Sequence, residues 1–379
     1  MKIVGIVCEY NPFHAGHARQ IRLIRESFGT DCAIVCLMSG NFVQRGAPAI
    51  FDKSLRARAA LESGADLVLE LPITRALSSA EGFAAGGVEI LGKFCDALCF
   101  GAETADADAL MDTAALLLRD GFREALREAL DTGLSFPAAR QRALERLGGN
   151  GALVSLPNNI LAVEYCKAIL GSGCAMVPFP IHREGDYHAQ VPETGNPSAA
   201  SLRKLIVQRR DISPYLPASA GDIFRDAVIH TLSAGEKAIL YRLRTMTEPE
   251  FAALPYGSEG LWRKFMHASR EQTSVEGILT AVKSKRYTRS RLDRMLMCAV
   301  LGITEARMNA PVPYTRVLGF REGGKAVLRL ARETGVFLHA GVPARDAYWE
   351  LEQRCGDLYG LFADVPEAPG AEKRRRMIL

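Results

Sequence analysis

The chain has 379 residues, a length that suits two or three domains. Its apolar content of 48% is ordinary for a globular protein, and a formal net charge of +4 excludes a chain that is strongly basic throughout. No apolar run reaches the roughly 18 residues of a membrane span, and Glu9 interrupts the first run too early for a signal peptide, so we expect a cytoplasmic protein.

Cysteine usage supports the same expectation. The nine cysteines are odd in number, form no CxxC pair and lie mostly within apolar runs. Reduced, buried thiols in the cytosol explain this pattern better than disulfides. Cys32 and Cys36, like Cys95 and Cys99, are separated by three residues, but both pairs fall in strand-like runs, so we predict no protein-bound metal.

The first hundred residues alternate between strand and helix patterns. Apolar runs predict strands at residues 3–8, 32–37, 66–71 and 97–100, and helical patterns occupy 18–27, 52–64 and 79–91. Asp52 is placed to cap the second helix and Gly64 to end it. Continuous apolar strands joined by helices predict an α/β fold with a Rossmann-like parallel sheet covered on both faces. Ligands bind such sheets at the carboxyl ends of the strands.

The rest of the chain is mainly helical. We predict a helical insertion at about 104–150, a helix at 157–170, a last strand at 177–181 and a further helix at 198–208. Pro214 and Pro217 mark a predicted boundary between a catalytic domain, residues 1–215, and a mainly helical domain, residues 216–379. The basic tail at 372–376 is expected to be mobile.

Two histidines, His14 and His17, follow the first predicted strand and open the first predicted helix. Backbone N–H groups and the positive end of the helix dipole meet there, so anions bind. The i, i+3 spacing places both rings on one side, and Gly16 lets a phosphate approach the backbone. We predict that both imidazoles donate to the phosphates of a nucleoside triphosphate and stabilise charge that builds on phosphorus. Two polar residues on an exposed turn remain the alternative.

A polar loop follows the second predicted strand and is predicted to shape an acceptor pocket through Ser39, Gly40, Asn41, Gln44 and Arg45. A surface turn is the alternative. Lys53 lies near a helix start, an unfavourable place for a cation unless it reaches an anion, so a catalytic role is predicted. Arg56 and Arg58 are expected on a solvated helix face.

A serine and an arginine open the predicted helix at 198–208. Ser198 suits an N-cap, and Arg203 with the first backbone amides is predicted to bind the triphosphate from the side opposite the histidines. Arg183 directly follows a predicted strand, where it contacts a nucleotide or pairs with Glu184.

Positive charge is concentrated late in the chain. Residues 261–330 carry 14 basic and 5 acidic side chains, a local excess of +9 in a chain whose total is +4. Such a segment with an aromatic residue suits phosphate contacts and base stacking, although a solvated helix face is the usual alternative. The predicted RNA-binding residues are Lys283, Lys285, Arg286, Tyr287, Arg289, Arg291 and Arg294.

The HxGH turn after a first strand, with a later serine/arginine helix start, resembles the HIGH-type nucleotidyltransferases. Finer motifs resemble the bacterial tRNA(Met) cytidine acetate ligase family, and the resemblance runs from residue 1 to about 319. These motifs are EYNPFHAGH at 9–17, MSGNFVQRG at 38–46, DLVLELP at 66–72, residues 100–103, PNNILAVEY at 157–165, residues 183–185 and VKSKRYT at 282–288.

The resemblance implies a two-step reaction. Acetate attacks the α-phosphate of ATP, bound as its Mg complex, and gives acetyl-adenylate and pyrophosphate. The N4 amine of the wobble cytidine of elongator tRNA(Met) then takes the acetyl group, which yields N4-acetylcytidine and AMP. By motif, the resemblance implies ATP contacts from the segment 7–20, Gly101, Asn158 or Asn159, and Arg183. Together with the residues singled out above, the predicted catalytic residues are His14, His17, Lys53 and Arg203. The predicted ATP contacts are Val7, Cys8, Glu9, Tyr10, Asn11, Pro12, Phe13, His14, Gly16, His17, Gln20, Gly101, Asn158, Asn159, Arg183 and Ser198.

One position departs from the superfamily. A threonine usually stands three residues before the arginine of the serine/arginine motif, and this chain has Ala200 there. Two other function classes also remain open. A small-molecule adenylyltransferase of cofactor synthesis needs only the first domain, and a noncatalytic tRNA- or ribosome-binding factor uses nucleotide as a switch.

Overall fold

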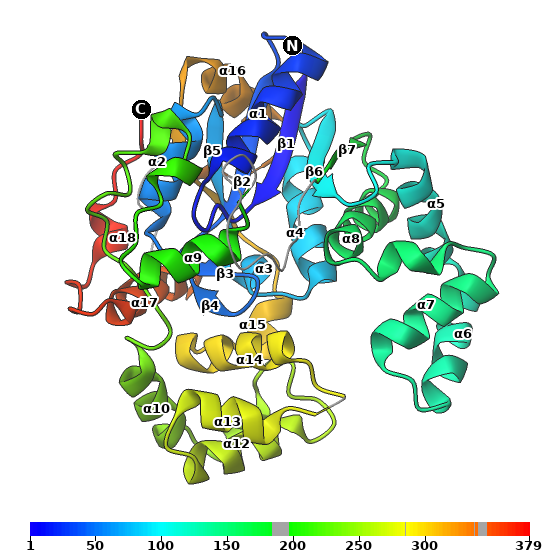
Figure 1. The fold of residues 1–379 in the computed structure, drawn as a ribbon, viewed down its shortest axis with the longest axis vertical. Coiled ribbons are helices and arrows are strands. Elements are labelled where there is room, and N and C mark those ends of the chain that lie inside the picture. The colour runs from blue at the N-terminus through cyan, green and yellow to red at the C-terminus, as the bar shows by residue number, and fades with distance from the viewer. Residues whose placement is uncertain (184–196, 285, 337, 340–346) are drawn as a thin grey trace.

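The computed structural model describes residues 1–183, 197–284, 286–336, 338–339 and 347–379 (Figure 1). Its centre is a seven-stranded sheet with the strand order β7-β6-β1-β2-β5-β8-β9. The strands are β1 (Ile3–Cys8), β2 (Ala33–Ser39), β5 (Leu67–Leu71), β6 (Ala97–Ala102), β7 (Val177–His182), β8 (Thr315–Phe320) and β9 (Leu338–His339). The α/β fold and the five strands predicted from the sequence are confirmed, whereas β8 and β9 were not predicted.

The five predicted strands run parallel, and β8 joins the edge of β5 antiparallel. Cys8 at the end of β1 aligns with Met38 near the end of β2. The histidine turn and the polar loop therefore leave the sheet at the same edge, where ligands bind in parallel sheets. The polar loop carries a small hairpin of β3 (Phe42–Val43) and β4 (Ala47–Pro48).

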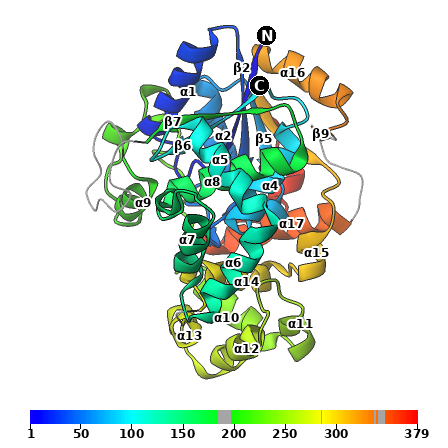
Figure 2. The ribbon, with the colours of Figure 1, turned by 90° about the vertical axis from the view of Figure 1, so that its right-hand side faces the viewer.

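Helices cover both faces of the sheet, as Figure 2 shows. Alternate strand residues point to opposite faces, so Ile3 and Val35 belong to one hydrophobic cluster and Val4 and Ile34 to another. The first cluster packs against α4 (Ala80–Leu91), α8 (Pro157–Ser172) and α16 (Glu322–Glu333). The second packs against α1 (Ala15–Phe28), α2 (Lys53–Glu62) and α9 (Ala199–Val207).

The predicted helix caps are confirmed. The Asp52 carboxylate accepts a hydrogen bond from the Ser54 backbone N–H at 2.8 Å, and the Ser198 hydroxyl accepts one from Ser201 N–H at 3.1 Å. Gly64 follows α2 with a φ of +107°, a backbone conformation that favours glycine.

Two helical regions extend from the sheet. The predicted insertion forms a side arm of α5 (Ala107–Leu118), α6 (Asp120–Asp131) and α7 (Phe136–Arg146), and η1 (Gly151–Val154) leads into α8 (Figure 1). A separate hydrophobic cluster holds the second region, below the sheet in Figure 1. This region comprises α10 (Glu236–Thr245), α11 (Glu248–Ala252), α12 (Leu261–Glu271), α13 (Val275–Val282), α14 (Arg289–Leu301) and α15 (Glu305–Asn309). Three further short helices are α3 (Ile73–Ala76), which follows β5, and η2 (Ser213–Tyr215) and η3 (Ala218–Ala220), which follow α9.

After α15 the chain returns to the sheet, which the predicted domain boundary did not anticipate. β8 pairs with β5, and α17 (Ala347–Tyr359), η4 (Gly360–Phe362) and α18 (Ala371–Arg374) follow. Residues 315–379 therefore do not belong wholly to a separate helical domain. The reason is physical: β8 has an almost fully buried apolar face, which completes the sheet beside β5.

The expectation of a mobile tail is wrong. Glu372 is only 2% exposed and accepts from Lys53 Nζ at 2.9 Å and from Arg316. Arg375 donates to both carboxylate oxygens of Asp52, at 2.7 and 2.9 Å. Burial and ion pairing hold the tail against α2. The partners of the tail lie far away in the sequence, so the run of charged residues alone does not reveal these ion pairs. Of the helices in the described part of the chain, none is both long and apolar enough to span a membrane.

Candidate active site

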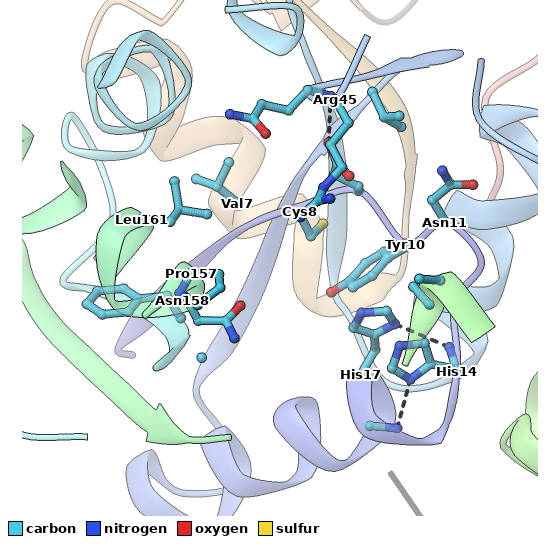
Figure 3. A pocket seen from close by; sticks show the side chains of 18 of the residues that line it. Val7, Cys8, Tyr10, Asn11, His14, His17, Arg45, Pro157, Asn158 and Leu161 are labelled. Atoms are coloured by element: carbon cyan, nitrogen blue, oxygen red, sulfur yellow. Dashed lines mark hydrogen bonds between the residues drawn. The ribbon is translucent and has the colours of Figure 1, made fainter. Parts of the chain in front are cut away.

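A cavity of about 580 Å³ opens at the carboxyl edge of the sheet. Its wall comes from the end of β1, the first turns of α1 and α8, one side of α9 and the loop at 43–50. Figure 3 shows the two histidines on one side of the cavity and Val7, Leu161 and Pro157 on another. Most of the predicted ATP contacts line it, namely Val7, Cys8, Glu9, Tyr10, Asn11, His14, Gly16, His17, Gln20, Gly101, Asn158 and Arg183.

The histidine turn has the predicted position. His14 is the N-cap of α1, and its Nδ1 accepts from the Gly16 backbone N–H at 3.1 Å. His17 Nδ1 accepts from the His14 backbone N–H at 3.2 Å, and the two rings stack with centroids 3.7 Å apart. Because each Nδ1 is an acceptor, each neutral ring carries its proton on Nε2. Both rings therefore present an N–H donor on their Nε2 side.

Both histidines are held neutral. Burial, and then the positive charges of Arg183 and Arg203, lower the pKa of His14 to about 3. Burial and the neighbouring His14 lower the pKa of His17 well below its ordinary value. His14 Nε2 is buried and has no hydrogen-bond partner among the described residues. The turn thus supplies uncharged donors, and the positive charge that an anion needs comes from the arginines.

Arg203 reaches the same edge from α9. Its Nη1 donates to the Asn11 backbone carbonyl at 2.8 Å, and its side chain lines the cavity. Ser198 does not line the cavity, because its hydroxyl caps α9 and bonds the Ser201 hydroxyl at 2.9 Å. Its predicted ATP contact stays a prediction. Ala200, the position that departs from the superfamily, does line the cavity.

The opposite end of the cavity joins three predicted residues. Arg183 Nη1 donates to Asn158 Oδ1 at 3.1 Å, beside Gly101. The Asn158 amide donates to Glu103 at 2.7 Å. Asn159 is fully buried and turned away, since its Oδ1 accepts from Thr104 N–H. Of the two asparagines, Asn158 is the one that faces the cavity, and the predicted pairing of Arg183 with Glu184 lies outside the described residues.

Pro12 and Phe13 complete the predicted segment without lining the cavity. Both are buried, and the Phe13 ring packs edge-on against Tyr10 at 4.8 Å. They support the turn from behind and make no wall for a ligand.

The predicted acceptor loop divides into two parts. Gln44 and Arg45 line the cavity, and the Gln44 backbone N–H donates to Glu9 at 2.7 Å. Burial raises the pKa of Glu9, although this N–H and Arg203 oppose the shift. Ser39, Gly40 and Asn41 are buried behind the loop and do not line the cavity. Asn41 instead binds the start of α2, accepting from Lys53 N–H at 2.8 Å.

Lys53 is buried and does not line the cavity, so the structure gives its predicted catalytic role no support. The anions that it reaches are protein carboxylates: its Nζ lies 2.7 and 2.8 Å from Glu70 and 2.9 Å from Glu372. Arg56 was expected in solvent and is fully buried. It donates to the backbone carbonyls of Glu9 (Nη1) and Gly40 (Nη2), which fixes both loops at the sheet edge. Arg58 is exposed and pairs with Glu62, as a solvated helix residue does.

Sequence reasoning missed several residues of the wall. Phe83, Leu161 and Tyr165 form an apolar side with Val7. Leu161 and Tyr165 belong to the PNNILAVEY motif, so a wider search of that motif would have found them. His230, Thr231 and Leu232 also line the cavity, but they carry no local motif, and only the tertiary fold brings them there.

The basic segment lies at α13 and α14 and is only partly free for RNA. Arg294 is 9% exposed and lies over the Tyr256 ring at 5.2 Å, so its predicted RNA contact is wrong. Arg291 donates to the Tyr256 carbonyl at 2.7 Å, and Arg289 pairs with Glu276. Lys283 and Arg286 are exposed, and Tyr287 is partly exposed. Lys285 lies outside the described residues.

Within the described ranges, no group of three or more His, Cys, Asp or Glu side chains is arranged to hold a metal ion. The cavity offers donors for phosphates instead: neutral imidazoles, two arginines and the amides at a helix start. This is the donor set of a nucleotide-binding site.

The chain matches the family described as HIGH Nucleotidyl Transferase over residues 1–373, and it belongs to this family. It is also similar to particular relatives. It is 34% identical to the tRNA(Met) cytidine acetate ligase of Acetivibrio thermocellus, with 95% of this chain and 94% of the relative covered. It is 36% identical to the protein of the same name from Clostridium acetobutylicum, with 88% of each covered.

The fold is also similar to that of solved structures. The apo structure of Thermotoga maritima TmcAL superimposes with a TM-score of 0.91 at 30% identity, over 100% of this chain and 99% of that one. A second form of the same protein, bound with α-thio ATP, has a TM-score of 0.88 at 30% identity over the full length of both chains.

Proposed function

We propose that this protein is an ATP-dependent ligase that forms acetyl-adenylate and transfers the acetyl group to N4 of the wobble cytidine of elongator tRNA(Met). The observation that carries the proposal is the stacked pair of neutral imidazoles at the start of α1, which lines one cavity together with Arg183 and Arg203. The relatives that bear this activity in their name, and the relative bound with α-thio ATP, support it.

In the first step a carboxylate oxygen of acetate attacks the α-phosphorus of ATP, and the bond to pyrophosphate breaks. The Nε2–H groups of His14 and His17 donate to the phosphate oxygens, where negative charge builds during displacement. Arg183 and Arg203 supply positive charge on the same site. The neutral state of the rings keeps their donors present across the physiological pH range.

An apolar wall suits the methyl group of acetate. Val7 and Leu161 lie side by side in the cavity, next to Asn158 and across from the histidines (Figure 3). The Phe83 and Tyr165 rings line the same cavity and are both 2% exposed. One cavity thus combines an apolar surface for the methyl group with donors for the phosphates.

In the second step the cytidine amine attacks the acetyl carbonyl and releases AMP. An aromatic amine is a poor nucleophile, so prior activation of acetate as a mixed anhydride is required. The exposed Lys283 and Arg286 and the partly exposed Tyr287 supply phosphate and stacking contacts for the tRNA. All nine cysteines are unpaired, as expected in the cytoplasm, where we place the reaction.

The test is to incubate the purified protein with ATP, acetate and unmodified elongator tRNA(Met) and to analyse the nucleosides by mass spectrometry. We expect N4-acetylcytidine that depends on both ATP and acetate. His14→Ala and His17→Ala should each lower acetate-dependent ATP–pyrophosphate exchange by at least about 100-fold while tRNA binding stays intact. Folded protein that makes no acetylcytidine would contradict the proposal, and exchange that requires a cofactor precursor would indicate a small-molecule adenylyltransferase.

A further inference from the structure

His230 lies in the wall between two hollows of the molecule. The residue is 2% exposed and lines the nucleotide cavity together with Thr231 and Leu232. Its backbone N–H donates to the Ile50 carbonyl at 3.0 Å, directly after the acceptor loop. The imidazole is therefore fixed beside the part of the cavity that the acceptor loop borders.

A carboxylate holds the far side of this ring. His230 Nε2 lies 2.7 Å from Glu367 Oε2, and the ring stacks on Tyr359 with centroids 3.8 Å apart and planes 15° apart. Glu367 lines a second hollow of about 410 Å³, and its side chain is 43% exposed. The His230–Glu367 pair thus connects the cavity with solvent on the other side of the wall.

The tautomer follows from this contact. A carboxylate only accepts hydrogen bonds, so the proton of the neutral ring is on Nε2 and Nδ1 carries a lone pair. Nδ1 is buried and has no hydrogen-bond partner among the described residues. Leaving a buried acceptor unpaired costs about 1–3 kcal/mol, which a purely structural histidine avoids.

The histidines of the HxGH turn have the opposite arrangement. Both use Nδ1 to accept a backbone N–H and carry the proton on Nε2. They can donate to phosphate but have no lone pair to remove a proton. His230 differs from them because its hydrogen-bond partner is the Glu367 carboxylate, bound at Nε2. The lone pair on its Nδ1 is therefore not used by a hydrogen bond among the described residues.

We propose that His230 is the general base of the transfer half-reaction and that Glu367 is its positioning residue. This inference rests on the proposed function. As the cytidine N4 attacks, the N–C bond to the acetyl group forms and the acyl C–O bond of the anhydride breaks, with its electron pair leaving on the phosphate of AMP. The N4 proton passes to His230 Nδ1, and Glu367 stabilises the imidazolium. The Nε2 proton then leaves through the exposed carboxylate to solvent.

The experiment separates the two half-reactions. Acetate-dependent ATP–pyrophosphate exchange reports adenylate formation, and single-turnover transfer of labelled acetate to tRNA reports the second step. His230→Phe keeps a ring on Tyr359 but removes the proton acceptor. We expect exchange within about twofold of the wild-type rate and transfer slower by about 10²–10³-fold, the usual contribution of a general base. Glu367→Gln should slow transfer by about tenfold.

His230→Ala tests the role of the ring itself, because added imidazole should restore part of its transfer rate and leave exchange unchanged. Transfer at the wild-type rate in His230→Phe, or equal loss of exchange and transfer in both His230 variants without rescue, would overturn the assignment. The wild-type protein in the same assays reports on the proposed function separately: if it makes no acetylcytidine, the function is wrong and the assignment of His230 with it.

Discussion

A Cβ atom on Gly46 would lie 2.3 Å from the backbone nitrogen of Arg294. Gly46 belongs to the acceptor loop, directly after Gln44 and Arg45 of the cavity wall, and Arg294 belongs to α14, which carries the end of the basic segment. The cavity and the predicted RNA-binding region are thus in backbone-to-backbone contact.

We expect Gly46→Ala to separate these two regions. Its φ of +74° is strained for alanine, and the new methyl group meets backbone that a side-chain rotation cannot move. Acetyl transfer to tRNA should fall by at least about tenfold, with a smaller effect on pyrophosphate exchange. Gly133→Ala is the matched control, because Gly133 has a similar φ of +84° and no atom within 4 Å of the added Cβ. Equal behaviour of the two variants would contradict the contact.

Lys283 and Arg286 should contribute to tRNA affinity. They are exposed on the α13–α14 side, so the double variant Lys283→Glu/Arg286→Glu should weaken tRNA binding and flatten its dependence on salt. Binding assays at several ionic strengths give the slope. The double variant Arg329→Glu/Arg332→Glu is a control with the same charge change at exposed positions of α16, at the other end of the molecule (Figure 1). An equal loss in the control would mean that overall charge, and not this surface, binds the tRNA.

Leu161 should restrict the size of the acyl group. Leu161→Ala enlarges the apolar wall beside Val7 by the volume of an isopropyl group, which makes room for one more methylene. We expect the ratio of kcat/KM for propionate to that for acetate to rise by about tenfold, since one methylene is worth about 1–3 kcal/mol in such a pocket. The measurement is pyrophosphate exchange with each acid. An unchanged ratio would place the methyl group elsewhere in the cavity.

The buried Glu352 should make stability depend on pH. Burial, then repulsion from Glu70, raises its pKa to about 7, and Tyr314 donates to it at 2.6 Å. The folded state then binds a proton that the unfolded chain releases near its ordinary pKa, so this group's contribution to the unfolding free energy falls as pH rises from about 4.5 to 7. His14 and His17 have lowered pKa values, so below pH 6.5 the unfolded chain binds more protons at these residues than the folded protein does. Their contribution to the unfolding free energy therefore falls as pH falls.

A difference measurement isolates the carboxyl group. Glu352→Gln should gain about 1–3 kcal/mol over the wild type at pH 8 relative to pH 5, because the amide carries no buried charge at either pH. Urea denaturation of both proteins at the two pH values gives the difference. A difference in unfolding free energy between Glu352→Gln and the wild type that is the same at both pH values would contradict the raised pKa of Glu352.

The tail should be essential for stability. Glu372→Gln removes the anion that Lys53, Arg316 and Arg375 share: Lys53 keeps Glu70 and Arg375 keeps Asp52, but the buried Arg316 loses its ion-pair partner. We expect a loss of about 3–5 kcal/mol in the free energy of unfolding. Arg374→Ala, at the exposed neighbouring position of α18, should cost little, because its side chain donates only to the Pro369 and Ala368 carbonyls. A similar loss in both variants would mean that the helix, and not the ion cluster, carries the effect.

Local patterns were sufficient for much of the fold and part of the site. Continuous apolar runs that alternate with helical patterns predicted the five parallel strands. The HxGH motif predicted the position of His14 and His17, because a strand, a turn and a helix cap depend on residues that are neighbours in the chain. Lys53 was misplaced because its partners, Glu70 and Glu372, are 17 and 319 positions away. β8 and His230 were missed for the same reason: what makes them part of the sheet and of the cavity is contact with distant segments.

The return of the chain to its first domain has a consequence for biosynthesis. β8 pairs with the edge of β5, Glu372 forms an ion pair with Lys53, and Arg375 forms one with Asp52. Until β8 has been synthesised the edge of β5 lacks this neighbour, and until the tail has followed, Lys53 lacks Glu372 and Asp52 lacks Arg375. The catalytic half therefore reaches its final state only after the segment from β8 to α18 has been synthesised, and a chain that stops before β8 should expose the edge of β5 to pairing with other chains.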